Sequence, residues 1–162
     1  MREGAKNIHL HSPVSKETIR AIASETLQAG AQEESPPAEP KIGDKMLDGT
    51  VYAGISPDTN QPMYAAPADA SLTMTFNEAK EYAAKLDAHG HQDWRVPTKA
   101  ELNVLFNNRE AIGGFDANAP GGNGMYYSSS PNEVWSLWGQ QFGSGDQQAY
   151  DKTYHSSVRC VR

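Results

Sequence analysis

The chain contains very little cysteine: Cys160 is the only one among its 162 residues. A single cysteine excludes a disulfide within the chain, and small secreted domains usually need such crosslinks. This scarcity favours folding in a reducing compartment. Cys160 also has the apolar neighbours Val158 and Val161. Because a buried thiol is inert, we expect no catalytic cysteine.

Positive charge and long apolar runs are scarce as well. Asp and Glu number 20 against 14 Lys and Arg, which gives a net charge of −6 without a basic cluster. A phosphate backbone repels such a surface, so we expect no nucleic-acid partner. No stretch is apolar and long enough for a signal peptide or a membrane span, so we expect neither standard export nor membrane insertion. If such a protein acts outside the cell, a carrier takes it there, for example a virion assembled in the bacterial cytoplasm and released by lysis.

Catalytic and metal-binding patterns are missing too. No Ser/His/Asp spacing or phosphate-binding glycine motif occurs, and residues 121–124 (Gly-Gly-Asn-Gly) indicate a flexible loop. His89, His91 and Asp93 are the most metal-like group, but no further ligand is obvious, and a solvated helix end explains them more simply. We therefore expect no enzymatic activity, no catalytic residue, no metal and no cofactor.

Turn-forming residues, in contrast, are plentiful, with 14 Gly and 10 Pro. Two capping boxes, Thr75 with Glu78 and Thr98 with Glu101, predict the starts of two helices. Residues 50–55 and 63–66 are predicted strands, and the last 40 residues alternate short β-like pieces with polar turns. The pattern predicts an α+β fold in which two helices pack on a small, twisted, mostly antiparallel sheet with long loops. The apolar faces expected for the two helices are Phe76, Ala79, Ala83 and Leu86, then Leu102, Leu105 and Phe106.

The N-terminal part differs in composition, which predicts two regions, residues 1–41 and 42–162. Ser15 is a predicted N-cap and Gly30 a predicted stop for a helix, and residues 33–40 form an acidic, Pro-rich spacer. One apolar stripe cannot be buried by a lone helix, so we predict an anchor that docks onto a partner or onto copies of itself. A helix packed on its own domain and a frayed tail remain alternatives. The partner-anchoring residues of the stripe are Ile19, Ile22, Ala23 and Leu27.

Five segments in a fixed order carry a resemblance to a known family: residues 48–54, 93–102, 113–115, 127–130 and 157–162. Their order resembles DUF1566, also called the Lcl C-terminal domain family, from near residue 43 to the end. That resemblance implies a C-type-lectin-like fold of the formylglycine-generating-enzyme branch. The enzyme chemistry of that branch needs a pair of thiols, which one cysteine does not provide. The calcium-binding motifs of many C-type lectins are also absent, so we expect no calcium site.

A narrower resemblance is to the variable proteins of diversity-generating retroelements, which are often encoded by phages or prophages. These proteins often have Tyr-Trp-Ser-Ser-Ser and Ala-Trp-x-Gln-x-Phe motifs, similar to residues 126–130 and 137–142 here. Tyr127 and Leu137 depart from those motifs. The resemblance implies that the stretch from this motif to the C-terminus is a diversified ligand-binding region.

The residues of the C-terminal region support a binding role by themselves. Trp138, Gln140 and Phe142 share one face of a predicted strand, most simply the core face, which leaves Gly139 and Gln141 pointing to solvent or to a ligand. Tyr, Trp, Ser, Asn and Gln are the residues that binding loops use, although an aromatic-rich loop packed on its own sheet is the simpler alternative. Trp94, Arg95, Arg159 and Arg162 are expected to be structural. The predicted ligand-binding residues are Asn132, Glu133, Trp135, Gly139, Gln141, Asp146, Gln148, Tyr150, Asp151, Thr153, Tyr154 and His155.

The leading hypothesis is a non-enzymatic receptor-binding module of a phage or prophage virion, such as a head or tail fibre. Its C-terminal loops would bind a protein or glycan on the host surface. Its N-terminal helix would attach it to a virion protein or to further copies of itself, as an oligomer. The alternatives are a bacterial protein that binds a glycan or a protein, and a structural decoration protein whose loops bind only neighbouring subunits.

Overall fold

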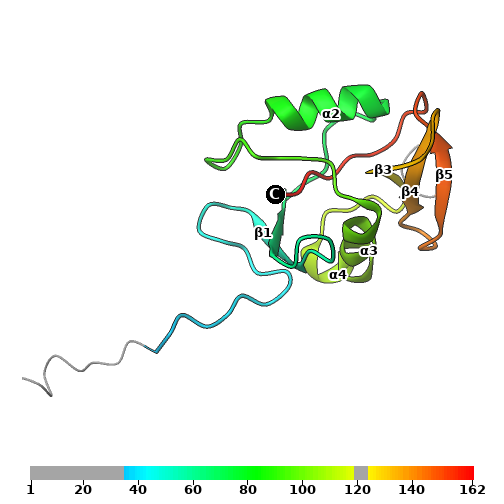
Figure 1. Cartoon of the computed structure of the whole chain (residues 1–162). Helices are drawn as coiled ribbons and strands as arrows, with labels where there is room; N and C mark the ends of the chain where they lie inside the picture. The colour runs from blue at the N-terminus through cyan, green and yellow to red at the C-terminus, as the bar shows by residue number, and fades with distance from the viewer. Residues whose placement is uncertain (1–34, 119–123) are drawn as a thin grey trace, which may run out of the picture. The chain divides into compact units, whose positions relative to one another are not determined.

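A computed structural model describes residues 35–118 and 124–162 of the chain (Figure 1). The chain divides into two units, Met1–Glu39 and Pro40–Arg162, and the second unit holds all of the described helices and strands. The predicted anchor helix, with Ile19, Ile22, Ala23 and Leu27, lies outside the described residues.

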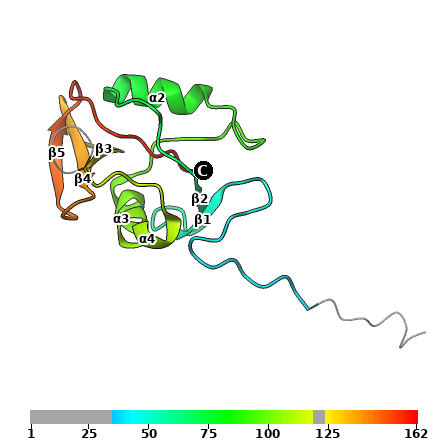
Figure 2. The ribbon, with the colours of Figure 1, turned by 180° about the vertical axis from the view of Figure 1, so that it is seen from behind.

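The second unit begins with a β-hairpin. Strands β1 (Val51–Ile55) and β2 (Pro62–Ala65) are antiparallel, as predicted for residues 50–55 and 63–66. The turn between them places Asn60 at φ 57°, a backbone conformation that asparagine tolerates better than most residues. Val51, Ala53, Met63 and Ala65 point inward and are almost completely buried. Figure 2 shows this hairpin beside the end of the chain.

Two capped helices follow, and both predictions are confirmed. Helices α2 (Phe76–Lys85) and α3 (Lys99–Asn107) each begin with a complete capping box, from Thr75 and Thr98 respectively. Each box satisfies backbone N–H groups that a helix start otherwise leaves without partners. The inward-facing residues include Phe76, Ala79 and Ala83 of α2 and Leu102 and Leu105 of α3. A short helix that the sequence did not suggest, α4 (Arg109–Ile112), continues after Asn108.

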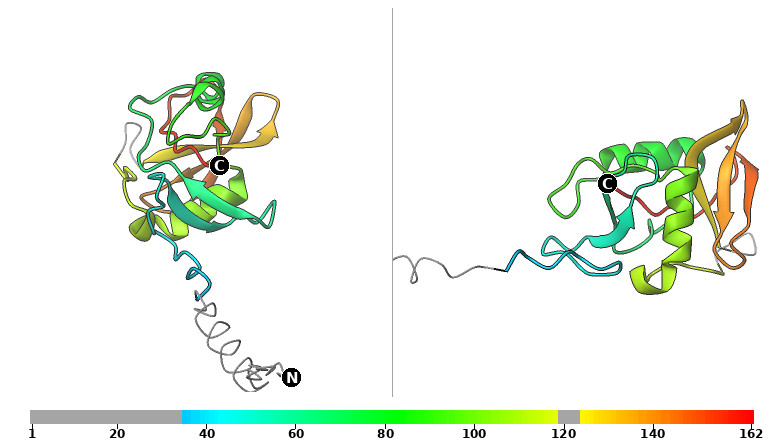
Figure 3. Two further views of the ribbon diagram at one scale, coloured as in Figure 1. Left: turned by 90° about the vertical axis from the view of Figure 1, so that its left-hand side faces the viewer. Right: turned by 60° about the horizontal axis from the view of Figure 1, so that its bottom comes forward.

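The remaining strands form a second sheet. Strands β3 (Met125–Glu133), β4 (Ser136–Gln141) and β5 (Gln147–Asp151) are antiparallel in the order β3-β4-β5, so β4 is central and β5 is an edge. The pairing of β3 with β4 is irregular between Tyr127 and Pro131. Figure 3 shows the β3–β4 hairpin projecting from the body of the second unit.

The last residues run through the middle of the second unit, between α2 and the α3–α4 pair (Figures 1 and 2). Isolated bridges join Val161 to Ala65 and to Arg95, and the segment is buried from Ser156 to Val161. Val158, Cys160 and Trp94 belong to one apolar cluster, with Trp94 3% exposed, which confirms that Trp94 is a core residue.

Three arginines link these segments. Arg159 is 1% exposed; its Nε donates to Asp69 Oδ1 at 2.6 Å, and its Nη1 donates to the carbonyl oxygens of Ala66 and Gly113. Arg162 donates to Asp93 at 2.8 Å, and Arg95 donates twice to Glu101. The predicted structural roles of these arginines are therefore confirmed.

The α+β prediction is confirmed as well. In the described residues, three helices combine with two small antiparallel sheets, which is consistent with the C-type-lectin-like fold that the resemblance implies. Two features go beyond the prediction: α4, and the division of the strands between two sheets. Among the same residues, no helix has both the length and the hydrophobicity needed to cross a membrane.

Candidate ligand-binding surface

The turn between β3 and β4 is the most exposed apolar feature of the C-terminal sheet. Residues 131–135 are all exposed, with Val134 at 73% and Trp135 at 78%. Beside them, the Asn132 amide donates to Ser136 Oγ at 3.2 Å. Removing large apolar side chains from water is favourable, and these two side chains remain in water. Their exposure side by side at a hairpin turn therefore requires an explanation.

A second exposed segment lies against this turn. Lys152 follows β5, its backbone N–H donates to Trp135 O at 3.0 Å, and its ammonium donates to Val134 O at 2.8 Å. The next residues, Thr153 to His155, are exposed, with Tyr154 at 60%. Residues 132–135 and 151–155 therefore form one surface, which we call the tip surface.

A buried tyrosine supports the tip surface from below. The Tyr127 hydroxyl donates to Asp151 O at 3.1 Å and also to Tyr154 O. Burial, assisted by the nearby Asp151 charge, raises the pKa of Tyr127 to about 12, so the hydroxyl remains a donor at neutral pH. The ring packs edge-on against Phe76, with the centroids 6.1 Å apart.

The start of α2 fixes the same segment from the other side. The Phe76 N–H donates to Lys152 O at 3.1 Å, and Met74 and Ser156 exchange two backbone hydrogen bonds of 3.1 Å. Since the supporting bonds mostly involve main-chain atoms, the backbone of the tip surface is ordered before any ligand arrives. Binding to such a surface costs less conformational entropy than binding to a loop that must first be ordered.

The chemistry of the tip surface is polar and aromatic. Trp135 and Tyr154 provide exposed rings, Asn132 an amide, and Glu133 and Asp151 carboxylates. Hydrogen bonds from the Thr153 side chain and backbone lower the pKa of Asp151, so this carboxylate is ionised at neutral pH. The arrangement offers ring faces and hydrogen-bonding groups to a ligand.

Seven predicted ligand-binding residues come together here, and the others do not. The seven are Asn132, Glu133, Trp135, Asp151, Thr153, Tyr154 and His155. Asp146 lies at the opposite end of β5, about 17 Å from Asp151 at the rise of an extended strand. Gln148 is exposed within β5, while Gln141 and Tyr150 are half-buried and hydrogen-bonded to each other at 2.9 Å.

The extent of burial in β4 differs from the prediction at two positions. Gly139 is buried rather than facing solvent or a ligand, because a Cβ added there would lie 2.8 Å from the Tyr150 ring and 2.9 Å from Tyr126 O. Trp138 is half-buried rather than a full core residue, and the Lys99 ammonium lies 3.2 Å from its ring centroid. The atoms that cover Gly139 belong to β5 and β3, the two strands that pair with β4.

Two residues of the tip surface were missed by sequence reasoning. Val134 is an isolated apolar residue between Glu133 and Trp135, and such exposure is a weak signal in a single sequence. Lys152 is a bridge between two segments, a role that depends on the tertiary arrangement.

His89 and His91 both make hydrogen bonds to Asp48 and connect two turns of the chain. His91 Nε2 lies 2.6 Å from Asp48 Oδ2, and this hydrogen bond, with others from Thr50, lowers the pKa of Asp48. His89 Nδ1 lies 2.9 Å from Asp48 O. In the part of the chain that the structure describes, no three His, Cys, Asp or Glu residues come together as metal ligands. The contacts of His89 and His91 with Asp48 join the 46–50 turn to the 88–91 turn.

Most of the second unit matches a known protein family. The model described as the Lcl C-terminal domain matches residues 55–162, which include both capped helices, the three-stranded sheet and the whole tip surface. A comparison with curated proteins found no match.

Proposed function

Because the chain belongs to the Lcl C-terminal domain family, we propose that its second unit is a non-enzymatic ligand-binding module that binds through the tip surface. The observation that carries the proposal is the exposure of Trp135 and Tyr154, at 78% and 60%, on a backbone fixed by Tyr127 and Phe76. Exposed aromatic residues on a rigid support are typical of the residues that dominate binding energy.

The proposed setting is a phage or prophage virion. The tip surface binds a protein or glycan on the host, and residues 1–41 attach the chain to a virion protein or to other copies of itself. Many copies on one particle raise a weak single-site affinity through avidity. The similarity of residues 126–130 and 137–142 to retroelement variable proteins supports this setting, as does the position of the tip surface downstream of Tyr127.

The proposal includes no catalytic step. Cys160, the only thiol, is 3% exposed, and burial raises its pKa to about 12. A thiol that stays protonated and shielded is a poor nucleophile.

The test measures binding of the full-length chain, labelled at its N-terminus, to intact cells of a panel of Gram-negative and Gram-positive bacteria. The test variant is Trp135→Ala/Tyr154→Ala, whose side chains are exposed and can be removed without opening the core. The control is Leu47→Ala, which removes a fully exposed apolar side chain outside the tip surface. Circular dichroism checks the fold of each variant.

We expect saturable binding to at least one cell type, a loss of at least about ten-fold in the double variant, and no change in the control. If the chain binds none of the cell types saturably, the receptor-binding role is overturned. Equal binding of the double variant and the wild type would overturn the assignment to the tip surface.

A further inference from the structure

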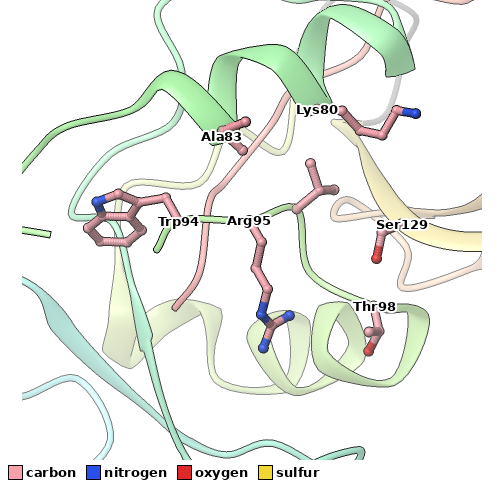
Figure 4. A pocket seen from close by; sticks show the side chains of 8 residues that line it. Lys80, Ala83, Trp94, Arg95, Thr98 and Ser129 are labelled. Atoms are coloured by element: carbon pink, nitrogen blue, oxygen red, sulfur yellow. The ribbon is translucent and has the colours of Figure 1, made fainter. Parts of the chain in front are cut away.

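A cleft of about 430 Å³ lies between α2 and the segment that leads into α3, away from the residues that form the tip surface. Its volume falls in the range of small-molecule sites. The lining residues come from three separate parts of the chain. Figure 4 labels Lys80 and Ala83 of α2, Trp94, Arg95 and Thr98 of the segment that leads into α3, and Ser129 of β3.

The inner wall of the cleft is apolar, and the indole N–H of Trp94 within it has a hydrogen-bond partner. Ala83, Trp94 and Val96 are 2%, 3% and 4% exposed, so they are packed into the core and present only a small part of each side chain to the cleft. The indole N–H of Trp94 donates to Ala88 O at 3.1 Å, so no buried indole N–H remains without an acceptor. An apolar group placed here is removed from water at about 25 cal/mol per Å² of its surface.

Two cations, Arg95 and Lys80, line the cleft, and they differ in whether a carboxylate is paired with them. Arg95 donates to both oxygens of Glu101, at 2.5 and 2.7 Å, so its charge is compensated by a buried carboxylate. Lys80, in contrast, has no ion-pair partner among the described residues, and its ammonium lies 5.0 Å from the Phe76 ring centroid. On the same helix, Lys85 is paired with Glu81 at 3.4 Å.

The polar groups also gather at one end. In Figure 4, the Lys80 amine and Ser129 lie at the end of the cleft opposite Trp94, whereas Arg95 points towards α3. The Ser129 hydroxyl has only a long hydrogen bond, 3.4 Å to Pro97 O, and can turn to donate to a ligand. The cleft therefore has an apolar end and an end with a cation and a hydroxyl.

We propose that this cleft binds a small amphipathic carboxylate, with its apolar body on Ala83, Trp94 and Val96 and its carboxylate beside Lys80 and Ser129. This site is separate from the tip surface and does not depend on the function proposed for it. The ion pair with Lys80 is solvent-exposed, so it adds about a two- to five-fold preference for the anion over a neutral analogue. The rest of the affinity comes from the apolar body.

The test is a titration of the full-length, ¹⁵N-labelled chain with 2-naphthylacetate and with the neutral 2-naphthaleneethanol, followed by amide NMR. We expect saturable shifts at Ala83, Ala84 and Val96, with the acid bound two- to five-fold more tightly than the alcohol. The variant Lys80→Gln should bind acid and alcohol equally. The matched control Lys85→Gln should keep the preference, because Lys85 lies outside the cleft lining.

A third variant separates the cleft from other apolar surfaces. Ala84 is exposed, so Ala84→Phe fills the cleft while leaving the core intact, and it should abolish binding of both probes. The Trp135→Ala/Tyr154→Ala variant should bind both probes as the wild type does. Any one of three results would overturn the proposal. They are saturable shifts at the tip surface instead of the cleft, no saturable shifts up to the solubility limit, and an unchanged preference for the acid in Lys80→Gln.

Discussion

Glu101 offers the sharpest test of how the second unit is held together. The side chain is fully buried, yet it is an acid on the first turn of α3. Arg95 donates to both of its oxygens, Ser56 Oγ donates at 2.6 Å, and Thr98 N–H donates at 2.9 Å. Burial alone raises the pKa of Glu101, but these hydrogen bonds outweigh burial and lower the pKa to about 2.

The substitution Glu101→Gln removes the charge and keeps the shape. Glutamine can still accept the capping bond from Thr98, so the start of α3 is retained. A pKa lowered from 4.5 to about 2 corresponds to about 3 kcal/mol of folding stability at neutral pH. Arg95 is 40% exposed, so water can solvate the guanidinium that is left behind. We therefore expect a loss of about 2–3 kcal/mol, at or just below the lower limit of about 3 kcal/mol for breaking a fully buried pair.

The pH dependence follows from the direction of the shift. A carboxyl group whose pKa is lower in the folded state stabilises the fold above its unfolded pKa of 4.5, and this contribution disappears as the pH falls towards about 2. The difference between the wild type and Glu101→Gln should therefore be full at pH 7 and shrink steadily below pH 4.5.

Urea unfolding at several pH values measures this difference, with Glu110→Gln as a control on the exposed side of α4. The control should lie within about 0.5 kcal/mol of the wild type. A loss below about 1 kcal/mol for Glu101→Gln at pH 7, or a loss that does not shrink in acid, would refute the reasoning.

Three further predictions concern packing and reactivity. Gly139→Ala should lower stability by about 1–3 kcal/mol, measured by thermal unfolding, because the added methyl group meets Tyr126 O, a backbone atom; an unchanged melting temperature would contradict this. Leu102→Ala, at a residue 1% exposed, should cost about 2–5 kcal/mol in urea unfolding, whereas Leu72→Ala, at a residue 73% exposed, should change stability by less than about 0.5 kcal/mol; similar losses would be inconsistent with the burial described. Cys160 should react with a thiol-specific disulfide reagent at pH 8 only after denaturant is added, since burial raises its pKa to about 12, and rapid labelling of the native chain would show otherwise.

Helices α2 and α3 and the β1–β2 hairpin were predictable because their sequence signals are local. A capping box specifies a helix start within four residues, so Thr75 and Thr98 marked α2 and α3 correctly. The short helix α4 has no such signal, since Asn108 makes no side-chain cap.

The burial of β4 was not predictable by the same reasoning. A period of two shows which residues share a face, but it does not show how much cover each face receives. Gly139 is covered by Tyr150 from the next strand, whereas Trp138 is half-buried, with the Lys99 ammonium over its ring. The cleft beside Lys80 was not predictable from the sequence either, because its lining residues lie on three segments that are distant along the chain.

The way the tip surface is supported bears on how freely its side chains can change. Lys152 N–H donates to the Trp135 carbonyl, and the Tyr127 hydroxyl donates to the carbonyls of Asp151 and Tyr154. These acceptors are main-chain atoms, which every amino acid supplies. Replacing the exposed side chains at 135, 151 or 154 therefore leaves the supporting bonds in place, whereas replacing Tyr127 removes the bonds that its hydroxyl makes. A surface built in this way keeps its shape while its chemistry varies, which a diversified ligand-binding region of the kind implied by the retroelement resemblance would require.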